Sequence, residues 1–112
     1  MSCIFCKIAS GEIPTTKAYE NDHVVAFYDM APQAPTHILI IPKAHIASLS
    51  EITEENADVG RHIFLAVAEL AARAEFAGGY RVVSNCGADG GQTVGHLHFH
   101  MLAGRALAWP PG

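Results

Sequence analysis

Polar and apolar residues alternate strictly over residues 96–101 of the segment HLHFHML, residues 96–102. A period of two is typical of a β-strand, in which alternate side chains share a face. We therefore expect His96, His98 and His100 to project together from one face, while the apolar residues between them point to the other. A helix would instead spread the three imidazoles around its circumference.

Shorter apolar runs predict the remaining strands. The runs at residues 16–20 and 23–29 are rich in β-forming residues and are separated by an Asn-Asp pair, which is typical of a turn, so they predict a hairpin. Residues 36–42, THILIIP, predict a third strand that a proline ends. Residues 80–85, YRVVSN, predict a fourth strand, so the histidine segment is the fifth and last.

Residues 53–77 carry apolar side chains three or four positions apart, which predicts one long helix. Thr53 is a candidate N-cap, two glutamates follow it at the positive end of the helix dipole, and glycines at 78–79 end the pattern. The expected inner stripe consists of Val59, Ile63, Val67, Leu70 and Ala74. Residues 3–10 predict a second, short helix. These elements predict an α+β fold with a five-stranded, mostly antiparallel sheet, one long helix and one short helix.

Composition narrows the class of protein. The chain has 112 residues, half of them apolar, which predicts one compact domain over residues 1–112. The formal net charge is -4 and no run of Lys or Arg is present, so neither nucleic acid nor an anionic membrane surface is an expected partner. No stretch reaches the about 20 apolar residues of a membrane span, and the first residues lack the features of a signal peptide, so we expect a cytoplasmic protein. Three cysteines, an odd number, argue against a disulfide framework.

The histidine face has three interpretations. It fits a polar strand face open to solvent, a tripod of neutral imidazoles that binds zinc, or a nucleophile with two helpers. With an ordinary pKa near 6.5, most of an imidazole is neutral at pH 7 and can attack phosphorus. The adjoining loop at residues 86–95, CGADGGQTVG, favours the third interpretation, because glycines let backbone N–H groups converge on an anion. Thr93 adds a hydroxyl donor there, and Asn85 ends the preceding strand.

These segments together resemble a known family. HLHFHML fits the His-x-His-x-His-x-x pattern, with apolar residues at x, of histidine triad (HIT) proteins, and specifically the branch of histidine triad nucleotide-binding proteins. The resemblance extends through YDMAPQAPTHILIIPKAHI, GADGGQTVGHLHFH and the C-terminal AWPPG, so it covers nearly the whole chain. It implies the HIT fold, and hydrolysis or transfer at the α-phosphate of nucleotides through a nucleotidyl-histidine intermediate.

The same resemblance implies roles for residues of this chain. It makes His98 the nucleophile, with His100 and Thr93 completing the catalytic set and His100 positioning the phosphate. Asp29 would bind both ribose hydroxyls, since an ionised carboxylate accepts two hydrogen bonds. Phosphate or leaving-group contacts are implied for Asn85, Gly91 and Thr93. The rest of the nucleotide pocket is expected to consist of Ile4, Ile8, Phe27, Tyr28 and Met30.

A second constellation lies near the N-terminus. Cys3 and Cys6 form a C-x-x-C pair, a common half of a zinc site. The chain is similar here to some bacterial HIT proteins and related nucleotidylyltransferases, which hold structural zinc on two Cys and two His. That similarity implies His45 and His96 as the other two ligands. The alternative is that both cysteines are buried as small apolar residues.

The resemblance implies a purine nucleoside phosphoramidase that hydrolyses compounds such as AMP-NH2 or AMP-lysine, with no cofactor needed for the chemistry itself. Two alternatives stay open: a dinucleoside polyphosphate hydrolase on the same scaffold, and a nucleotide-sensing interaction protein whose turnover is incidental. The ending WPPG resembles the phosphoramidase branch. The family also implies a homodimer in which residues 80–83 of two subunits pair, with Trp109 bordering the leaving-group site of the other subunit.

Overall fold

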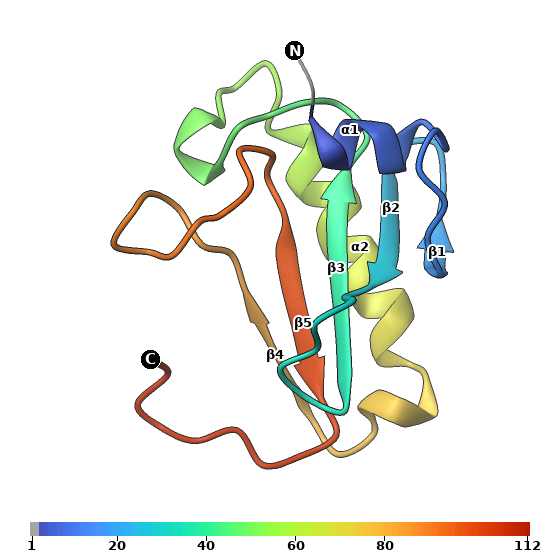
Figure 1. Ribbon diagram of the computed structural model, residues 1–112, viewed down its shortest axis with the longest axis vertical. Coiled ribbons are helices and arrows are strands. Elements are labelled where there is room, and N and C mark those ends of the chain that lie inside the picture. The colour runs from blue at the N-terminus through green and yellow to red at the C-terminus, as the bar shows by residue number, and fades with distance from the viewer. Residues whose placement is uncertain (1–2) are drawn as a thin grey trace.

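One antiparallel sheet organises the computed structural model, which describes residues 3–112 (Figure 1). The strands are β1 (Lys17–Glu20), β2 (Val24–Tyr28), β3 (Thr36–Pro42), β4 (Tyr80–Val83) and β5 (Phe99–Ala103). Their order in the sheet is β1-β2-β3-β5-β4, and every neighbouring pair is antiparallel. The helices are α1 (Ile4–Ala9) and α2 (Asp58–Ala71), with 3-10 turns at Leu49–Glu51 and Ala74–Phe76. The predicted α+β fold is confirmed.

The two helices cover opposite faces of the sheet (Figure 1). Ile63 and Leu70 of α2 are fully buried in the larger core, as predicted, together with Ala66, which was not predicted. The smaller core on the other face consists of Phe5, Ile8, Val25, Phe27, Leu39 and Ile41. Because strand side chains alternate, β2 and β3 supply residues to both cores. We call the face that α1 covers the α1 face.

The long helix is shorter than predicted at its start. It begins at Asp58, and its N-cap is Ala57, which makes no side-chain cap, so the prediction of Thr53 as N-cap is wrong. The Thr53 N–H instead donates to the side-chain oxygen of Asn56, at 2.7 Å, and the Asn56 N–H donates back to the Thr53 carbonyl. This local pairing holds the segment in a turn, and the polar side chain at 56 competes with the helix for backbone groups.

The helix also ends earlier than predicted. Arg73 has an extended backbone, with φ -80 and ψ 153, and its guanidinium donates to the Ala18 carbonyl at 2.6 Å. This break lets a separate 3-10 turn bury Phe76, while Ala74, predicted on the inner stripe, is exposed. Val59 and Val67 are half-buried against the larger core.

The histidine segment pairs later than predicted. β5 begins at Phe99 instead of His96, because the Leu97 N–H donates to the Ile46 carbonyl and not to a neighbouring strand. The alternation of faces nevertheless holds, since Leu97, Phe99 and Met101 lie in the core beside α2. β4 is also shorter, ending at Val83. In the part of the chain that the structure describes, neither helix has the length and apolar run that a membrane-spanning helix needs.

Candidate active site

A cavity of about 280 Å³ lies between α1 and the sheet, and we call it the α1 cavity. Its walls are mostly apolar, with Phe27 and Leu39 from the sheet and α1 on the other side. The predicted site residues that line it are Ile4, Ile8, Phe27, Tyr28, Asp29, Met30, Thr93, His98 and His100. Tyr28 differs from the others, because its hydroxyl lies toward Glu75, 3.5 Å away, and its ring packs against the core beside α2. The cavity thus joins an apolar pocket to two imidazoles.

The ring of His98 is held in a single tautomer. Its Nδ1 lies 2.7 Å from the carbonyl oxygen of His96, and a carbonyl only accepts, so Nδ1 carries the proton. Nε2 is therefore the unprotonated nitrogen of the neutral ring. The ring is buried, with the edge of Phe5 packed on it at a centroid distance of 5.0 Å. A fixed ring with a free Nε2 lone pair is the form that a nucleophile requires.

His100 stands at the end of a chain of hydrogen bonds. The backbone N–H of Gln33 donates to Nδ1 of His37 at 3.0 Å, so the proton of neutral His37 resides on Nε2. That Nε2–H donates to Nδ1 of His100, 2.9 Å away. Neutral His100 then carries its own proton on Nε2. The chain fixes both tautomers and leaves His100 as a donor to the α1 cavity.

Burial keeps both rings of this chain neutral. It lowers the pKa of His37, against the opposing effect of the Asp29 carboxylate, which lies 3.5 Å from His37 Nε2. Burial also lowers the pKa of His100, and the neighbouring His98 and His37 lower it further. Near pH 7 both imidazoles are therefore neutral, as the hydrogen bonds require.

Sequence reasoning assigned no role to His37. The register of β3 against β5 reveals it, because Leu39 lies opposite His100 and His37 lies opposite Leu102, on the same face. A sequence shows that both strands exist but not which residues face each other. Only the pairing of β3 with β5 shows that this fourth histidine lies beside the triad.

Asp29, His37 and His100 also form a cluster whose candidate ligand atoms lie within 4.8 Å of one another. The hydrogen bond from Gln33 to His37 excludes a metal there, since the Nε2 that faces the cluster holds a proton. The described residues contain no cluster that joins His96, His98 and His100, so the tripod interpretation of the triad is wrong. Each of the three histidines has a different set of neighbours.

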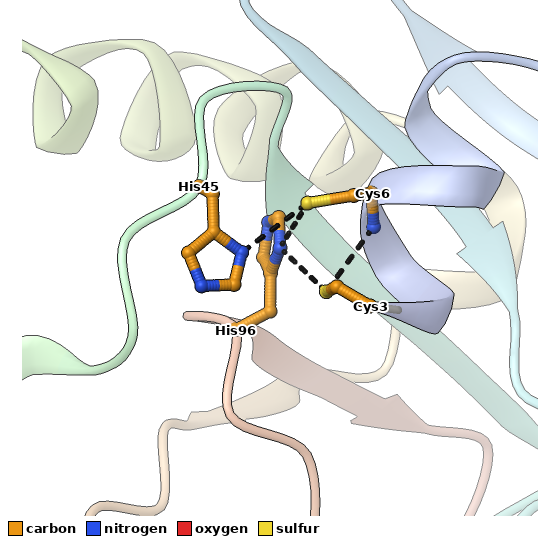
Figure 2. A group of neighbouring side chains, drawn as sticks. All are labelled: Cys3, Cys6, His45 and His96. Carbon is orange, nitrogen blue, oxygen red and sulfur yellow. Dashed lines mark hydrogen bonds between the residues drawn. The ribbon is translucent and has the colours of Figure 1, made fainter. Parts of the chain in front are cut away.

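Cys3, Cys6, His45 and His96 form a second cluster, with all four ligand atoms within 4.8 Å of one another. The cysteines come from the start of α1, His45 from the loop after β3, and His96 from the segment before β5 (Figure 2). The Cys6 Sγ lies 3.2 Å from His45 Nδ1 and 3.5 Å from His96 Nδ1, and the Cys3 Sγ lies 3.4 Å from His96 Nδ1. Tetrahedral zinc with ordinary bond lengths separates sulfur and nitrogen ligands by about 3.6 Å.

The tautomer of His96 supports this assignment. Its Nε2 donates to the carbonyl of Pro42 at 2.9 Å, so Nδ1 is unprotonated where it faces the two sulfurs. A histidine ligand is ordinarily oriented in this way, with its second nitrogen bound to a carbonyl. Two thiolates and two neutral imidazoles match a structural zinc site, and the predicted ligand set is brought together completely.

The resemblance implied a phosphate or leaving-group contact for Gly91, which lies in the glycine-rich loop at residues 86–95. Gly91 has φ 81, and its N–H donates to the Ala88 carbonyl at 3.1 Å, so that amide is not free to bind a phosphate. The backbone of the same loop approaches itself so closely that residue 90 must be glycine, since a Cβ on Gly90 would lie 2.3 Å from the carbonyl oxygen of Cys86. Thr93 does reach the α1 cavity, and Asn85 lines a second cavity.

This second cavity, of about 430 Å³, lies between the sheet and the C-terminal tail, and we call it the tail cavity. His37, Asn85 and His100 line it together with residues of the tail. Trp109, in the same tail, is 80% exposed and lies 6.0 Å from the guanidinium carbon of Arg81. The indole of this chain is therefore available for contact with another molecule.

Comparison with known proteins gives consistent matches over the whole chain. The family model described as HIT domain matches residues 10–107. A HIT-like protein of Synechococcus elongatus is 54% identical over 109 residues, which cover 97% of this chain and 96% of the relative. The 14 kDa zinc-binding protein of Zea mays is 47% identical over 112 residues, covering 97% of this chain and 87% of the relative.

Solved structures match equally well. The HIT family hydrolase of Legionella pneumophila Philadelphia 1 has a TM-score of 0.94 at 46% identity and covers 99% of this chain and 100% of its own. The histidine triad nucleotide-binding protein of Candida albicans has a TM-score of 0.82 at 37% identity, with 97% and 83% covered.

Proposed function

The chain belongs to the HIT domain family, and from this premise we propose that it is a purine nucleoside phosphoramidase. It would release AMP and an amine from compounds such as AMP-NH2 or AMP-lysine. The observation that carries the proposal is the tautomer of His98, which has Nδ1–H bound to the His96 carbonyl at 2.7 Å and Nε2 free. The apolar walls of the α1 cavity suit a purine, and Asp29 at its edge suits a ribose.

The reaction would proceed in two displacements at phosphorus. The Nε2 lone pair of His98 forms a bond to the α-phosphorus, and the P–N bond to the amine breaks as the amine takes the electron pair of that bond and a proton from solvent. Water then attacks the same phosphorus and the P–Nε2 bond breaks, which releases AMP, returns one proton to solvent and restores the neutral ring. His100, with a proton on Nε2, can donate a hydrogen bond to a phosphoryl oxygen in both steps.

Asp29 supplies ribose contacts without losing its structural ones. Its Oδ1 accepts from the Ala31 N–H at 2.8 Å, and its Oδ2 faces His37. A carboxylate has about four acceptor positions, so both oxygens can also accept from ribose hydroxyls. The zinc site, when loaded, would join α1 to the segment that precedes β5 and so hold the wall of the cavity in place; it supplies no reacting group.

We also propose that the protein is a homodimer. β4 lies at the edge of the sheet, with an unpaired side that another strand can join. On α2, Phe64 is 65% exposed and Leu65 is 53% exposed, and Tyr80 of β4 is 44% exposed. A two-fold pairing of β4 strands would cover these apolar side chains and would bring Trp109 toward the second subunit.

The test compares a fluorogenic AMP phosphoramidate with diadenosine tetraphosphate as substrates. We expect amine release from the first and little cleavage of the second, and the reverse would favour the dinucleoside polyphosphate hydrolase. His98→Ala should abolish turnover and leave AMP affinity close to that of the parent, whereas His23→Ala, an exposed histidine outside both cavities, serves as the matched control. Near-normal turnover by His98→Ala would refute the nucleophile assignment. AMP binding without turnover of either substrate would favour a nucleotide-sensing protein.

A further inference from the structure

Cys3 and Cys6 lie at the start of α1, close enough to bond to each other. Cys3 is the N-cap of the helix, and its Sγ accepts from the Cys6 N–H at 3.4 Å (Figure 2). The two Sγ atoms lie within 4.8 Å of each other. Positions three apart in a helix have Cα atoms about 5 Å apart, which is within the range that a disulfide spans. The pair can therefore take a second covalent state besides zinc ligation.

Zinc ligation and a disulfide between these cysteines exclude each other. Tetrahedral zinc holds two thiolate sulfurs about 3.8 Å apart, whereas a disulfide brings them to about 2.05 Å and leaves neither sulfur with a negative charge. His45 and His96 would remain as two neutral imidazoles, which are too few ligands to complete a structural zinc site. Oxidation of the pair would therefore release the metal.

Both sulfurs can be reached by a small oxidant. Cys3 and Cys6 are half-buried and do not belong to the fully buried interior. Cys3 also lines a cavity of about 520 Å³ together with Ile4 and His45, whose side chains are exposed, so this cavity opens to solvent. A sulfur that binds zinc is a thiolate, and the thiolate is the form of cysteine that attacks a peroxide.

The metal site also supports one wall of the α1 cavity. α1 has six residues, too few for a helix to be stable by itself, and only Phe5 and Ile8 are buried in it. Ile4 and Ile8 line the α1 cavity, and the edge of Phe5 packs on the ring of His98 at a centroid distance of 5.0 Å. Loss of the metal would thus free the start of a short helix that contacts both the pocket and the proposed nucleophile.

We propose that Cys3 and Cys6 form a reversible oxidation site, at which a hydroperoxide replaces zinc ligation by a disulfide and loosens the nucleotide pocket. One thiolate attacks a peroxide oxygen, the O–O bond breaks, and a sulfenic acid and hydroxide form. The second thiolate then attacks the sulfenic sulfur, the S–S bond forms, and a second hydroxide leaves. Two protons from solvent convert the hydroxides to water, so the pair gives two electrons to the peroxide. The inference rests on the proposed function in one respect, that AMP occupies the α1 cavity.

The test treats zinc-loaded Cys86→Ser protein with hydrogen peroxide. Cys86 lies outside the metal cluster, and its replacement leaves Cys3 and Cys6 as the only thiols of the chain. We expect about one zinc per chain to pass to a colorimetric chelator while both thiols are lost. Mass spectrometry should show a disulfide within one chain. Zinc release without this disulfide, or a disulfide in protein that retains its zinc, would overturn the proposal.

Hydrogen exchange and AMP binding measure the effect on the pocket. After oxidation the amides of α1 should exchange faster while those of β3 stay unchanged, and this readout needs no nucleotide. AMP affinity measured by calorimetry should fall about tenfold, as expected if α1 is then in place about a tenth of the time. If AMP does not bind the reduced protein, the proposed function fails, while faster exchange of α1 still supports the oxidation site. Unchanged exchange in fully oxidised protein would overturn it.

Matched controls separate the cysteine pair from other oxidations. Cys3→Ser with Cys6→Ser, in the same Cys86→Ser protein, should show fast exchange of α1 and weak AMP affinity before treatment, and peroxide should change neither. Peroxide also reaches Met30, which is 98% exposed and lines the α1 cavity. Dithiothreitol with zinc reverses a disulfide but not a methionine sulfoxide. AMP affinity that recovers therefore supports the cysteine pair, and affinity that stays low assigns the effect to Met30 and overturns the proposal.

Discussion

Replacing His37 tests the hydrogen-bond chain that ends at His100. His37 accepts from the Gln33 N–H through Nδ1 and donates to His100 through Nε2, at 3.0 and 2.9 Å. His37→Ala removes both contacts. The amide of His37→Gln reaches the place of Nε2 and can still donate to His100, whereas that of His37→Asn reaches only the place of Nδ1 and can still accept from Gln33. The three variants therefore separate the two halves of the chain.

The expected magnitudes follow from the groups left without partners. His37→Ala leaves a backbone N–H and the Nδ1 of His100 unpaired, and each loss costs about 1–3 kcal/mol when water cannot replace the partner. His37 is only 4% exposed but borders the tail cavity, so water can reach part of the space and we expect about 1–2 kcal/mol in the free energy of unfolding. Release of the His100 tautomer should lower kcat/KM by about 10- to 100-fold.

Hydrolysis of a fluorogenic AMP phosphoramidate and thermal melting at the same pH measure the two effects separately. We expect the activities to follow the order parent, Gln, Asn, Ala, because only Gln preserves the donor to His100. The stabilities of Gln and Asn should be similar, since each retains one contact. An Asn variant that is as active as the Gln variant, or an Ala variant with unchanged kcat/KM, would show that His37 does not position His100.

Three further predictions concern the metal, the pH dependence and the dimer. Cys3→Ser with Cys6→Ser should lose about one zinc per chain by elemental analysis and melt at lower temperature, while Cys86→Ser, which lies outside the cluster, should change neither. Burial holds the pKa of His37 below its ordinary 6.5, so as the pH falls the unfolded chain binds a proton at His37 before the folded chain does. The contribution of neutral His37 to the free energy of unfolding is therefore complete above pH 6.5 and decreases as the pH falls below 6.5. His37→Gln should flatten that fall in denaturant titrations at pH 7.5 and 5.5, and an unchanged slope would contradict the assignment. Removing residues 107–112 should leave a dimer by light scattering but alter the preference among leaving groups; a monomer at micromolar concentration would refute the proposed interface.

Periodicity predicted those parts of the fold that single elements determine. Alternation marked the histidine segment, and Leu97 and Met101 do lie in the core opposite the imidazoles. The C-x-x-C spacing at the start of a short helix places Cys3 and Cys6 one turn apart, so half of the metal cluster could be predicted from local structure. These predictions held because each depends on the geometry of one strand or one helix.

The remaining parts depend on interactions between elements. The start of α2 moved because the Asn56 side chain binds the Thr53 backbone, a competition that helix periodicity does not register. The position of His37 beside His100 depends on strand register, which a shift of one residue would reverse. Its role was missed for the same physical reason: His37 belongs to no recognisable local pattern, and only the assembled sheet brings it to the site.

His96 connects the cluster of Cys3, Cys6 and His45 to His98 through three separate groups. Its Nδ1 faces the thiols of Cys3 and Cys6, its Nε2 donates to the Pro42 carbonyl, and its own carbonyl accepts the Nδ1–H of His98. The first two contacts fix the ring and hence the backbone at residue 96, and the third transmits that position to the nucleophile two residues later. The alternating histidines therefore share a face for different reasons: the first holds the segment, the second presents a free Nε2, and the third presents its own Nε2–H toward the same cavity.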